Sequence, residues 1–463
     1  MNKFFRAFAT GTVLLAAPLA GCDKRLNIDP VDTVLADKAI QSSADVESLL
    51  RGGYAVLGSS DLYGGRLQYI SDLLGDPKGA NSELFWQGTY AQPNEIYHKS
   101  IAKTNTFVAG TWNQAYQAIN IANTVLANIS KVTPVKQDQI TGEAKFIRGI
   151  MYFELVRLFA KDWNNGSPTA NPGVPLVLTA TNTINGLEAA GPAAKIPRNT
   201  VAEVYAQVLL DLLDAELKLN PSAPGSATTT IFATTYTISG MLSRVYLQQR
   251  KYDLAAIEAD KVIKSGLFRL ITPISDVFAS KGNTNEDVFN MQVNVQSGVN
   301  DLNTFYSTYG RGGDISVNAI LSMSYDAADD RGQLFNQNYG TLTTKFDQVY
   351  GNVKVMRLAE MYLTRAEGNF RAGTHVGAEP FDDLNTVRGR SHAPLLMAAD
   401  VTLDALFTDR HQELSFEGFY LHDFKRNSRD VGDLSVTADN LILPIPQSEI
   451  NVNANLTQNP GYF

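Results

Sequence analysis

The sequence predicts a mainly α-helical fold, in which several helix pairs stack as a tetratricopeptide-like, right-handed solenoid beside a loop-rich irregular lobe. Three observations lead to this prediction. Apolar residues recur with helical spacing in several separate stretches. Long segments rich in Gly, Asn, Asp, Ser, Thr and aromatic residues separate these stretches. Cys22 is the only cysteine among 463 residues, so packed helices rather than disulfides must hold the fold together.

Met1–Gly21 has the layout of a secretory signal, with a short basic head followed by a mostly apolar run, Phe8–Ala20. This run is too short to span a bilayer comfortably, since a transmembrane helix takes roughly 20 residues. The Leu-Ala-Gly sequence before Cys22 is similar to a lipobox, where a bacterial lipoprotein is acylated and cleaved. We therefore expect a signal peptide over 1–21, lipidation of Cys22 and a lipid-anchored tether over 22–37. An uncleaved anchor or a chance cysteine is the alternative.

The charge of the chain argues against nucleic acid as a partner. It carries 39 basic and 47 acidic residues, and removing the two basic residues of the signal leaves a net charge of −10. Binding to nucleic acid needs a basic footprint, so we expect none. Once Cys22 is acylated, no thiol remains for disulfides, thiolate metal sites or cysteine catalysis.

The sequence lacks the motifs of common catalytic and metal sites. It contains no Gly-x-Ser-x-Gly elbow, Walker loop or G-x-G-x-x-G. No metal-ligand spacing relates the five histidines, His98, His375, His392, His411 and His422. We therefore expect no metal, no cofactor and no enzymatic activity. A lipoprotein glycosidase stays open as the less favoured alternative, because its carboxylate pair is defined by separation in space.

The clearest helices lie in the middle of the chain. The helix over 201–219 opens with a capping box formed by Thr200 and Glu203, and Pro221 ends it. Residues 233–266 have the pattern of one tetratricopeptide repeat, with two antiparallel helices and small alanines at their crossing.

Other helical stretches extend this pattern on both sides. We expect helices over 105–129 and 143–159, and a further pair that begins at Val355 and continues through 381–390. The stretch 143–159 is apolar nearly all round, so it should lie between neighbouring helices. One repeat cannot bury its own apolar face, so the pairs should stack into one solenoid. An unrelated helical bundle is the alternative.

The segments 58–98, 161–195 and 268–351 show little periodicity. Structureless loops of this length are uncommon unless they are functional. We interpret them as an irregular lobe with a few short strands, expected over 287–295 and 345–349.

Aromatic residues concentrate in this lobe, beside amides and carboxylates. An aromatic ring can cover the C–H face of a sugar while polar groups bind its hydroxyls, so this composition suits glycan recognition. Packing within the lobe is the more common role for any single aromatic, and Trp86 is the preferred candidate for a ligand platform. The predicted ligand-binding residues are Trp86, Tyr90, Asp72, Asn81, Tyr306, Tyr309, Arg311 and Tyr339.

An ordered set of motifs runs through the chain. It comprises Glu143–Arg148, Gly173–Leu176, Arg198–Leu212, Asp329–Arg331, Arg357–Glu367, Leu384–Arg390, Arg410–Gly418, Asp423, Arg426, Leu443–Pro446 and Gln458–Tyr462. Each motif alone is weak, but the ordered set resembles the SusD/RagB outer-membrane lipoproteins of Bacteroidota over nearly the whole mature chain. The resemblance implies four tetratricopeptide-like helix pairs and an irregular lobe, with the motif residues acting as scaffold.

On this interpretation residues 38–463 form one SusD-like domain. Its scaffold covers about 38–57, 103–160, 198–267 and 353–420. The ligand lobe covers about 58–100, 161–197 and 268–352, and a C-terminal tail covers 421–463.

The resemblance also implies a role. Such proteins are held at the outer membrane by an N-terminal lipid, face the cell exterior, and capture oligosaccharides, or peptides in some members. They deliver the ligand to a SusC-like TonB-dependent transporter, act as its lid, and bind without cleaving. A tetratricopeptide-type scaffold for protein partners and a peptide-binding importer component are the alternatives.

Overall fold

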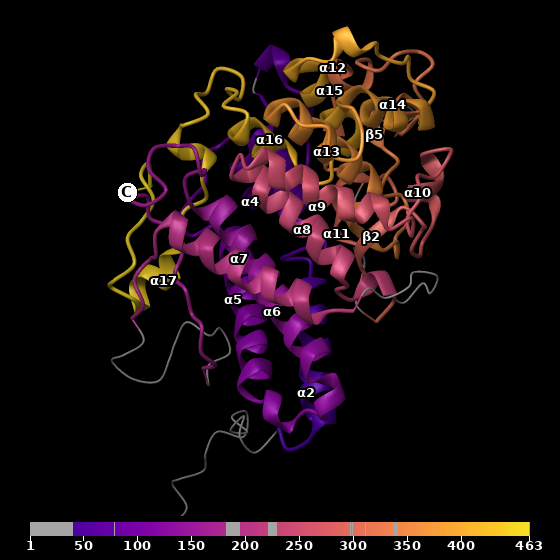
Figure 1. Ribbon diagram of the computed structural model, residues 1–463. Helices are drawn as coiled ribbons and strands as arrows, with labels where there is room; N and C mark the ends of the chain where they lie inside the picture. The colour runs from indigo at the N-terminus through magenta and orange to yellow at the C-terminus, as the bar shows by residue number, and fades with distance from the viewer. Residues whose placement is uncertain are drawn as a thin grey trace, which may run out of the picture. The chain divides into compact units, whose positions relative to one another are not determined.

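The helices stack largely in the order in which they occur along the chain (Figure 1). In the computed structural model each member of the series packs on the next, which confirms the predicted mainly helical, tetratricopeptide-like fold. The stacked helices are α2 (Ser43–Leu57), α5 (Thr106–Ala127), α6 (Pro134–Phe159), α7 (Val201–Lys218), α8 (Thr235–Gln248), α9 (Tyr252–Lys264), α13 (Leu358–Ala372) and α14 (Pro380–Arg390).

The structure describes residues 40–77, 79–181, 195–220, 229–296, 298, 300–310, 312–336 and 341–462. Within them, the chain from Gln41 onward forms one unit. The predicted signal peptide, Cys22 and the tether over 22–37 lie outside the described residues. In the described part of the chain, no helix combines the length and the apolar character needed to cross a bilayer.

The capping box predicted for α7 is present. The Thr200 hydroxyl accepts a hydrogen bond from the Glu203 backbone N–H, and the Glu203 carboxylate accepts one from the Thr200 backbone N–H at 2.7 Å. Helix α6 begins at Pro134, nine residues before the predicted start at Glu143. Of residues 142–159 of α6, all except Lys145 are buried, because α5 and α7 both pack on this helix.

A small residue sets the close approach of α9 and α13. A Cβ atom placed on Gly368 would lie only 2.6 Å from the carbonyl oxygen of Tyr252. Ala256 lies against the same point. Any larger side chain at Gly368 would therefore push the two helices apart.

Two helices lie in the segment 58–98, which was expected to be irregular. Arg66–Gly75 forms α3, in which every residue is buried, and Ala91–Tyr97 forms α4. Helix α3 packs tightly on α16 (Tyr420–Arg426), where a Cβ on Gly75 would meet the backbone of Leu421 at 2.6 Å.

The strand predictions need correction. Strand β2 (Asp287–Met291) is present but shorter than predicted, and 345–349 is not a strand. Residues Val353–Arg357 form strand β6 and pair antiparallel with β2, so the first three residues of the helix predicted to begin at Val355 belong to a strand. The helix begins only at Leu358, because the extended backbone before it belongs to this two-stranded sheet.

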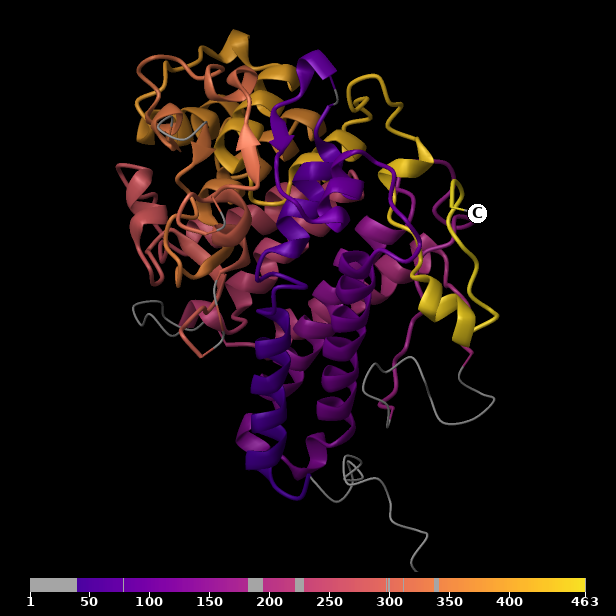
Figure 2. The same ribbon diagram turned by 180° about the vertical axis from the view of Figure 1, so that it is seen from behind.

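Two more small sheets complete the lobe, β1 (Leu84–Trp86) with β3 (Ile315–Val317) and β4 (Phe335–Asn336) with β5 (Leu342–Thr343). The chain from β1 to α4 and the chain around β3 lie close together on the side shown in Figure 2. The remaining α-helices are α10 (Ser275–Ala279), α11 (Asp301–Tyr306), α12 (Ala319–Ser322), α15 (Leu403–Leu414) and α17 (Gln447–Val452).

Candidate ligand-binding face

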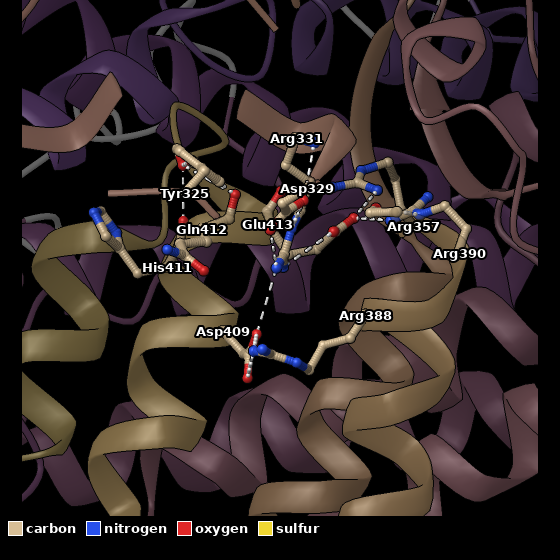
Figure 3. Close-up of polar contacts among 12 residues, drawn as sticks. Tyr325, Asp329, Arg331, Arg357, Arg388, Arg390, Asp409, His411, Gln412 and Glu413 are labelled. Atoms are coloured by element: carbon tan, nitrogen blue, oxygen red, sulfur yellow. Dashed lines mark hydrogen bonds and ion pairs between the residues drawn. The ribbon is translucent and has the colours of Figure 1, made fainter. Parts of the chain in front are cut away.

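The arginine-rich motifs meet in a buried network of ion pairs (Figure 3). Arg357 contacts Glu286 at 2.6 Å, Glu413 at 3.0 Å and Glu417 at 2.7 Å. Arg390 contacts Glu286 at 2.9 Å and also pairs with Glu413. The network ties together strand β6, helices α14 and α15, and the segment that carries Glu286.

Two further pairs extend this arginine network. Arg331 pairs with Asp329 at 2.6 Å, and Arg388 pairs with Asp409 at 2.8 Å (Figure 3). Burial alone would raise the pKa of Glu413, but the positive charges of Arg390 and Arg357 outweigh it and hold that pKa well below its usual range. The described carboxylates of the network are paired and shielded, so its chemistry is that of a scaffold.

A different surface lies over strands β1 and β3. The strands pair antiparallel, with Phe85 opposite Ser316 and Trp86 opposite Ile315. Since side chains alternate along a strand, Trp86 and Ile315 turn inward while Phe85 turns outward, with 51% of its surface exposed. The sheet therefore holds one aromatic ring at the surface on a rigid frame.

An aromatic cluster supports β1 from beneath. The ring of Phe305 lies 6.1 Å from Trp86, 6.2 Å from Tyr90, 4.8 Å from Tyr69 and 6.4 Å from Phe107, measured between ring centroids. Trp86 is only 6% exposed, whereas Tyr90 is 40% exposed at the edge of the cluster. The cluster braces Tyr90 and leaves part of its ring open to solvent.

The segment before β3 carries a third exposed ring. Tyr309 is 69% exposed, and its backbone N–H donates to the Ser307 hydroxyl, which in turn donates to Asp347 at 2.6 Å. Gln87 bridges from β1 to this segment, since its side-chain amide donates to the carbonyl of Gly313 at 2.6 Å. We use the name β1–β3 face for the exposed and partly exposed side chains of these segments, Phe85, Gln87, Tyr90, Tyr309 and Ser316.

The structure separates the predicted site residues into three groups. Tyr90 and Tyr309 belong to the β1–β3 face, and Asn81 is exposed in a 3₁₀ turn just before β1. Trp86, Asp72 and Tyr306 are buried beneath it, so the Trp86 ring packs in the cluster and offers no open face for stacking. Arg311 and Tyr339 lie outside the described residues.

Asp72 and Tyr306 contact each other. The Tyr306 hydroxyl donates to an Asp72 carboxylate oxygen at 2.9 Å. Burial raises the pKa of Asp72 to about 7, because desolvation outweighs this hydrogen bond and the charge of His411. The pair is thus part of the support beneath the β1–β3 face.

A partly buried pair, Glu83 and His411, links the residue before β1 to helix α15. Glu83 contacts the His411 ring nitrogen at 2.6 Å, and the Tyr420 ring stacks on His411 with 4.1 Å between centroids. Burial disfavours the charged Glu83, but His411 overcomes this cost and lowers the Glu83 pKa. In the described ranges, no group of three or more His, Cys, Asp or Glu side chains is placed to hold a metal ion.

The predicted site residues omit Phe85, Gln87 and Ser316 of the β1–β3 face, and Phe85 is the only aromatic residue among these three. The sequence prediction names its neighbour Trp86 as the ligand platform instead. The alternation of side chains along a short strand predicts that Phe85 and Trp86 lie on opposite sides. Which of the two faces outward depends on the pairing of β1 with β3.

Comparisons with known proteins agree with this architecture. Residues 33–247 match a family model described as starch-binding associating with outer membrane, and residues 333–441 match the model of the SusD family. The chain is 23% identical to SusD-like protein P2 of Formosa agariphila, over 97% of this chain and 98% of that protein.

Solved structures show the same fold. A SusD superfamily protein of Bacteroides thetaiotaomicron superposes with a TM-score of 0.80 at 23% identity, covering 90% of this chain and all of the other. A laminarin-binding SusD-like protein superposes with a TM-score of 0.72 at 21% identity, covering 91% of this chain and all of the other.

Proposed function

Since the chain belongs to the SusD/RagB family, we propose that it is a cell-surface, glycan-binding lipoprotein that captures oligosaccharides and delivers them to a SusC-like TonB-dependent transporter, acting as its lid. Cys22 would carry the lipid that holds the protein at the outer membrane. A tether after the lipid would allow the lid to move while it stays attached.

The observation that carries glycan binding is the β1–β3 face. Phe85, Tyr90 and Tyr309 expose aromatic surface on segments that β-pairing, the Phe305 cluster and the Gln87 bridge hold in place. Exposed rings on a rigid support can stack on sugar rings at little entropic cost, while Gln87 and Ser316 can bind sugar hydroxyls. The description of one matching family model and the name of one structural neighbour refer to carbohydrate binding, which favours the same ligand class.

Binding of soluble laminarin and soluble starch to the mature protein tests this proposal. We expect Phe85→Ala and Tyr309→Ala each to weaken binding, with no reducing ends released from either glycan. Tyr350→Ala is the matched control, because Tyr350 is a partly exposed tyrosine outside the face. Equal affinities for all four proteins would overturn the assignment of the face, and release of sugar would revive the glycosidase alternative.

One further observation favours a protein partner. Leu210, Leu213 and Leu217 lie along one side of α7 at helical spacing and are exposed to solvent. This stripe supports contact with the transporter or, in the alternative function, a tetratricopeptide-type scaffold. We expect the double substitution Leu210→Ser with Leu217→Ser to reduce co-purification of the transporter while glycan binding persists. Glycan binding and co-purification would fall together if the stripe were needed only for folding.

A further inference from the structure

The helical scaffold contains a cavity built from elements other than those of the β1–β3 face. It lies between α2, the first half of α6 and residues 232–234, which lead into α8. Its volume is about 440 Å³. Small-molecule sites typically span roughly 300–1,000 Å³, so the cavity is large enough to hold a ligand.

One side of the cavity is apolar and aromatic. Leu50 and Ile140 contribute aliphatic surface from α2 and α6. Phe232 packs edge-to-face on Tyr54, with 5.0 Å between ring centroids and 88° between the rings. Phe232 is only partly buried, so part of its ring remains open towards the cavity.

The other side carries a buried polar group. Glu143 is nine-tenths buried, and one of its carboxylate oxygens accepts a hydrogen bond from the Gln139 amide at 2.7 Å. The Tyr54 hydroxyl beside it accepts a hydrogen bond from the Ala233 backbone N–H at 3.0 Å. Burial raises the pKa of Glu143 despite hydrogen bonds from Gln139 and Tyr54, so the carboxylate would gain from additional donors.

The acidic and basic side chains that line the cavity are equal in number. Lys136 pairs with Glu47 at 3.0 Å on the rim, and the positive charge of Arg51 acts on both Glu47 and Glu143. Two basic and two acidic side chains therefore line the site, and a ligand with net charge would leave one of them uncompensated.

We propose that this cavity is a second saccharide site, which binds one or two neutral sugar rings against Phe232 with hydroxyl groups donating to Glu143. A sugar offers the combination that the walls require, an apolar C–H face for the aromatic side and several hydroxyl donors for the carboxylate. The site shares no element with the β1–β3 face, so it can bind a free oligosaccharide end or a second part of the same glycan.

Crystals of the mature protein soaked with maltose or laminaribiose, together with calorimetric titration, test this proposal. We expect sugar density beside Phe232 and Glu143, and affinities about tenfold weaker at this site in Phe232→Ala and in Glu143→Gln. Two variants serve as matched controls: Phe370→Ala removes a partly exposed phenylalanine on α13, and Glu258→Gln removes a buried glutamate on α9. Both should keep wild-type affinity.

Different outcomes would overturn the cavity site and the β1–β3 face. Two outcomes would overturn the second site and leave the proposed function intact. One is sugar density only at the β1–β3 face. The other is an unchanged affinity in both cavity variants, provided that thermal unfolding shows both variants to be folded. Binding of the dipeptide glycyl-lysine in the cavity in place of either sugar would overturn the ligand class. Loss of binding in Phe85→Ala with persisting density in the cavity would support two independent sites.

Discussion

Glu413 in the arginine network and Asp72 beneath the β1–β3 face are both buried, yet burial has opposite consequences for them. Three arginines, Arg331, Arg357 and Arg390, surround Glu413 and hold its pKa well below the usual range. Asp72 accepts a hydrogen bond from Tyr306 and contacts no arginine in the described residues, so desolvation prevails and raises its pKa to about 7.

This difference shows what each region does. In the arginine network, buried charges form ion pairs that join four segments of the scaffold. The network therefore stabilises the fold and does not mark a ligand site. The region under the β1–β3 face contains hydroxyl and aromatic groups, which support exposed rings. Burial of a carboxylate alone therefore does not distinguish a binding region from a scaffold; its partners do.

The largest effect is expected in the arginine network. Arg357→Ala should lower the free energy of unfolding by about 3–5 kcal/mol, because it leaves Glu286, Glu413 and Glu417 buried with fewer positive partners. Urea unfolding at pH 7 measures this loss. A change below about 1 kcal/mol, the size typical of exposed pairs, would contradict the description of this network as scaffold.

The raised pKa of Asp72 should make stability depend on pH. The folded-state pKa of Asp72, about 7, lies above the value of 3.8 for the unfolded chain, so the folded protein keeps a proton that the unfolded chain has lost. The contribution of Asp72 to stability should therefore fall as pH rises from about 4 to 7. In the wild type, Asp72 should lower the free energy of unfolding by on the order of 3 kcal/mol between pH 4 and pH 8, and Asp72→Asn should abolish this decrease. Urea unfolding of both proteins at the two pH values measures it.

Glu367 provides the opposite case. Burial would raise its pKa, but Arg426 and Arg371 lower it to about 2. Its contribution is therefore present above the unfolded value of 4.5 and is lost as pH falls towards 2. Glu367→Gln should change the pH profile only on that acid side. Equal pH profiles for Asp72→Asn and Glu367→Gln would contradict the opposite pKa shifts of these two buried carboxylates.

A smaller effect is expected at the β1–β3 face, and on binding instead of stability. Tyr309→Ala should weaken the affinity for a bound glycan by about 1–2 kcal/mol, because it removes one stacking surface. The free energy of unfolding should stay unchanged, since Tyr309 is mostly exposed. Calorimetric titration and urea unfolding of the same preparation separate the two quantities, and a loss of stability without a loss of affinity would assign Tyr309 to packing.

Local sequence signals predicted much of the scaffold. The capping box at Thr200 and the apolar stripe after it located α7 to within one residue at its end. The sequence does not predict helix α3, because all of its residues, including Asp72, are buried and no polar face produces a helical period. The sequence predicts helix from Val355 onward, because the strand that pairs with β6, β2, lies more than sixty residues earlier in the chain and no local pattern indicates the pairing.

The candidate site was less predictable for the same reason. Aromatic composition located the region that contains Tyr90 and Tyr309. It did not show which of Phe85 and Trp86 faces outward, because this depends on a partner strand about 230 residues away. The contact between Tyr306 and Asp72 likewise joins α11 to α3, and no local pattern encodes it.

The smallest effect concerns Asp260, which has one buried and one exposed partner. Arg365 contacts it at 2.5 Å from the buried side and is itself held by Asp383, whereas Lys264 contacts it at 2.7 Å from one turn further along α9 and is largely exposed. Lys264→Ala should lower the free energy of unfolding by less than about 0.5 kcal/mol, because water screens an exposed pair and Arg365 still compensates Asp260. Arg365→Ala, measured under the same conditions, should cost several times more, since it leaves two buried carboxylates without their shared partner. If both variants lost the same free energy of unfolding, burial of the partner would not determine the strength of these ion pairs. The distinction between scaffold pairs and surface pairs would then fail.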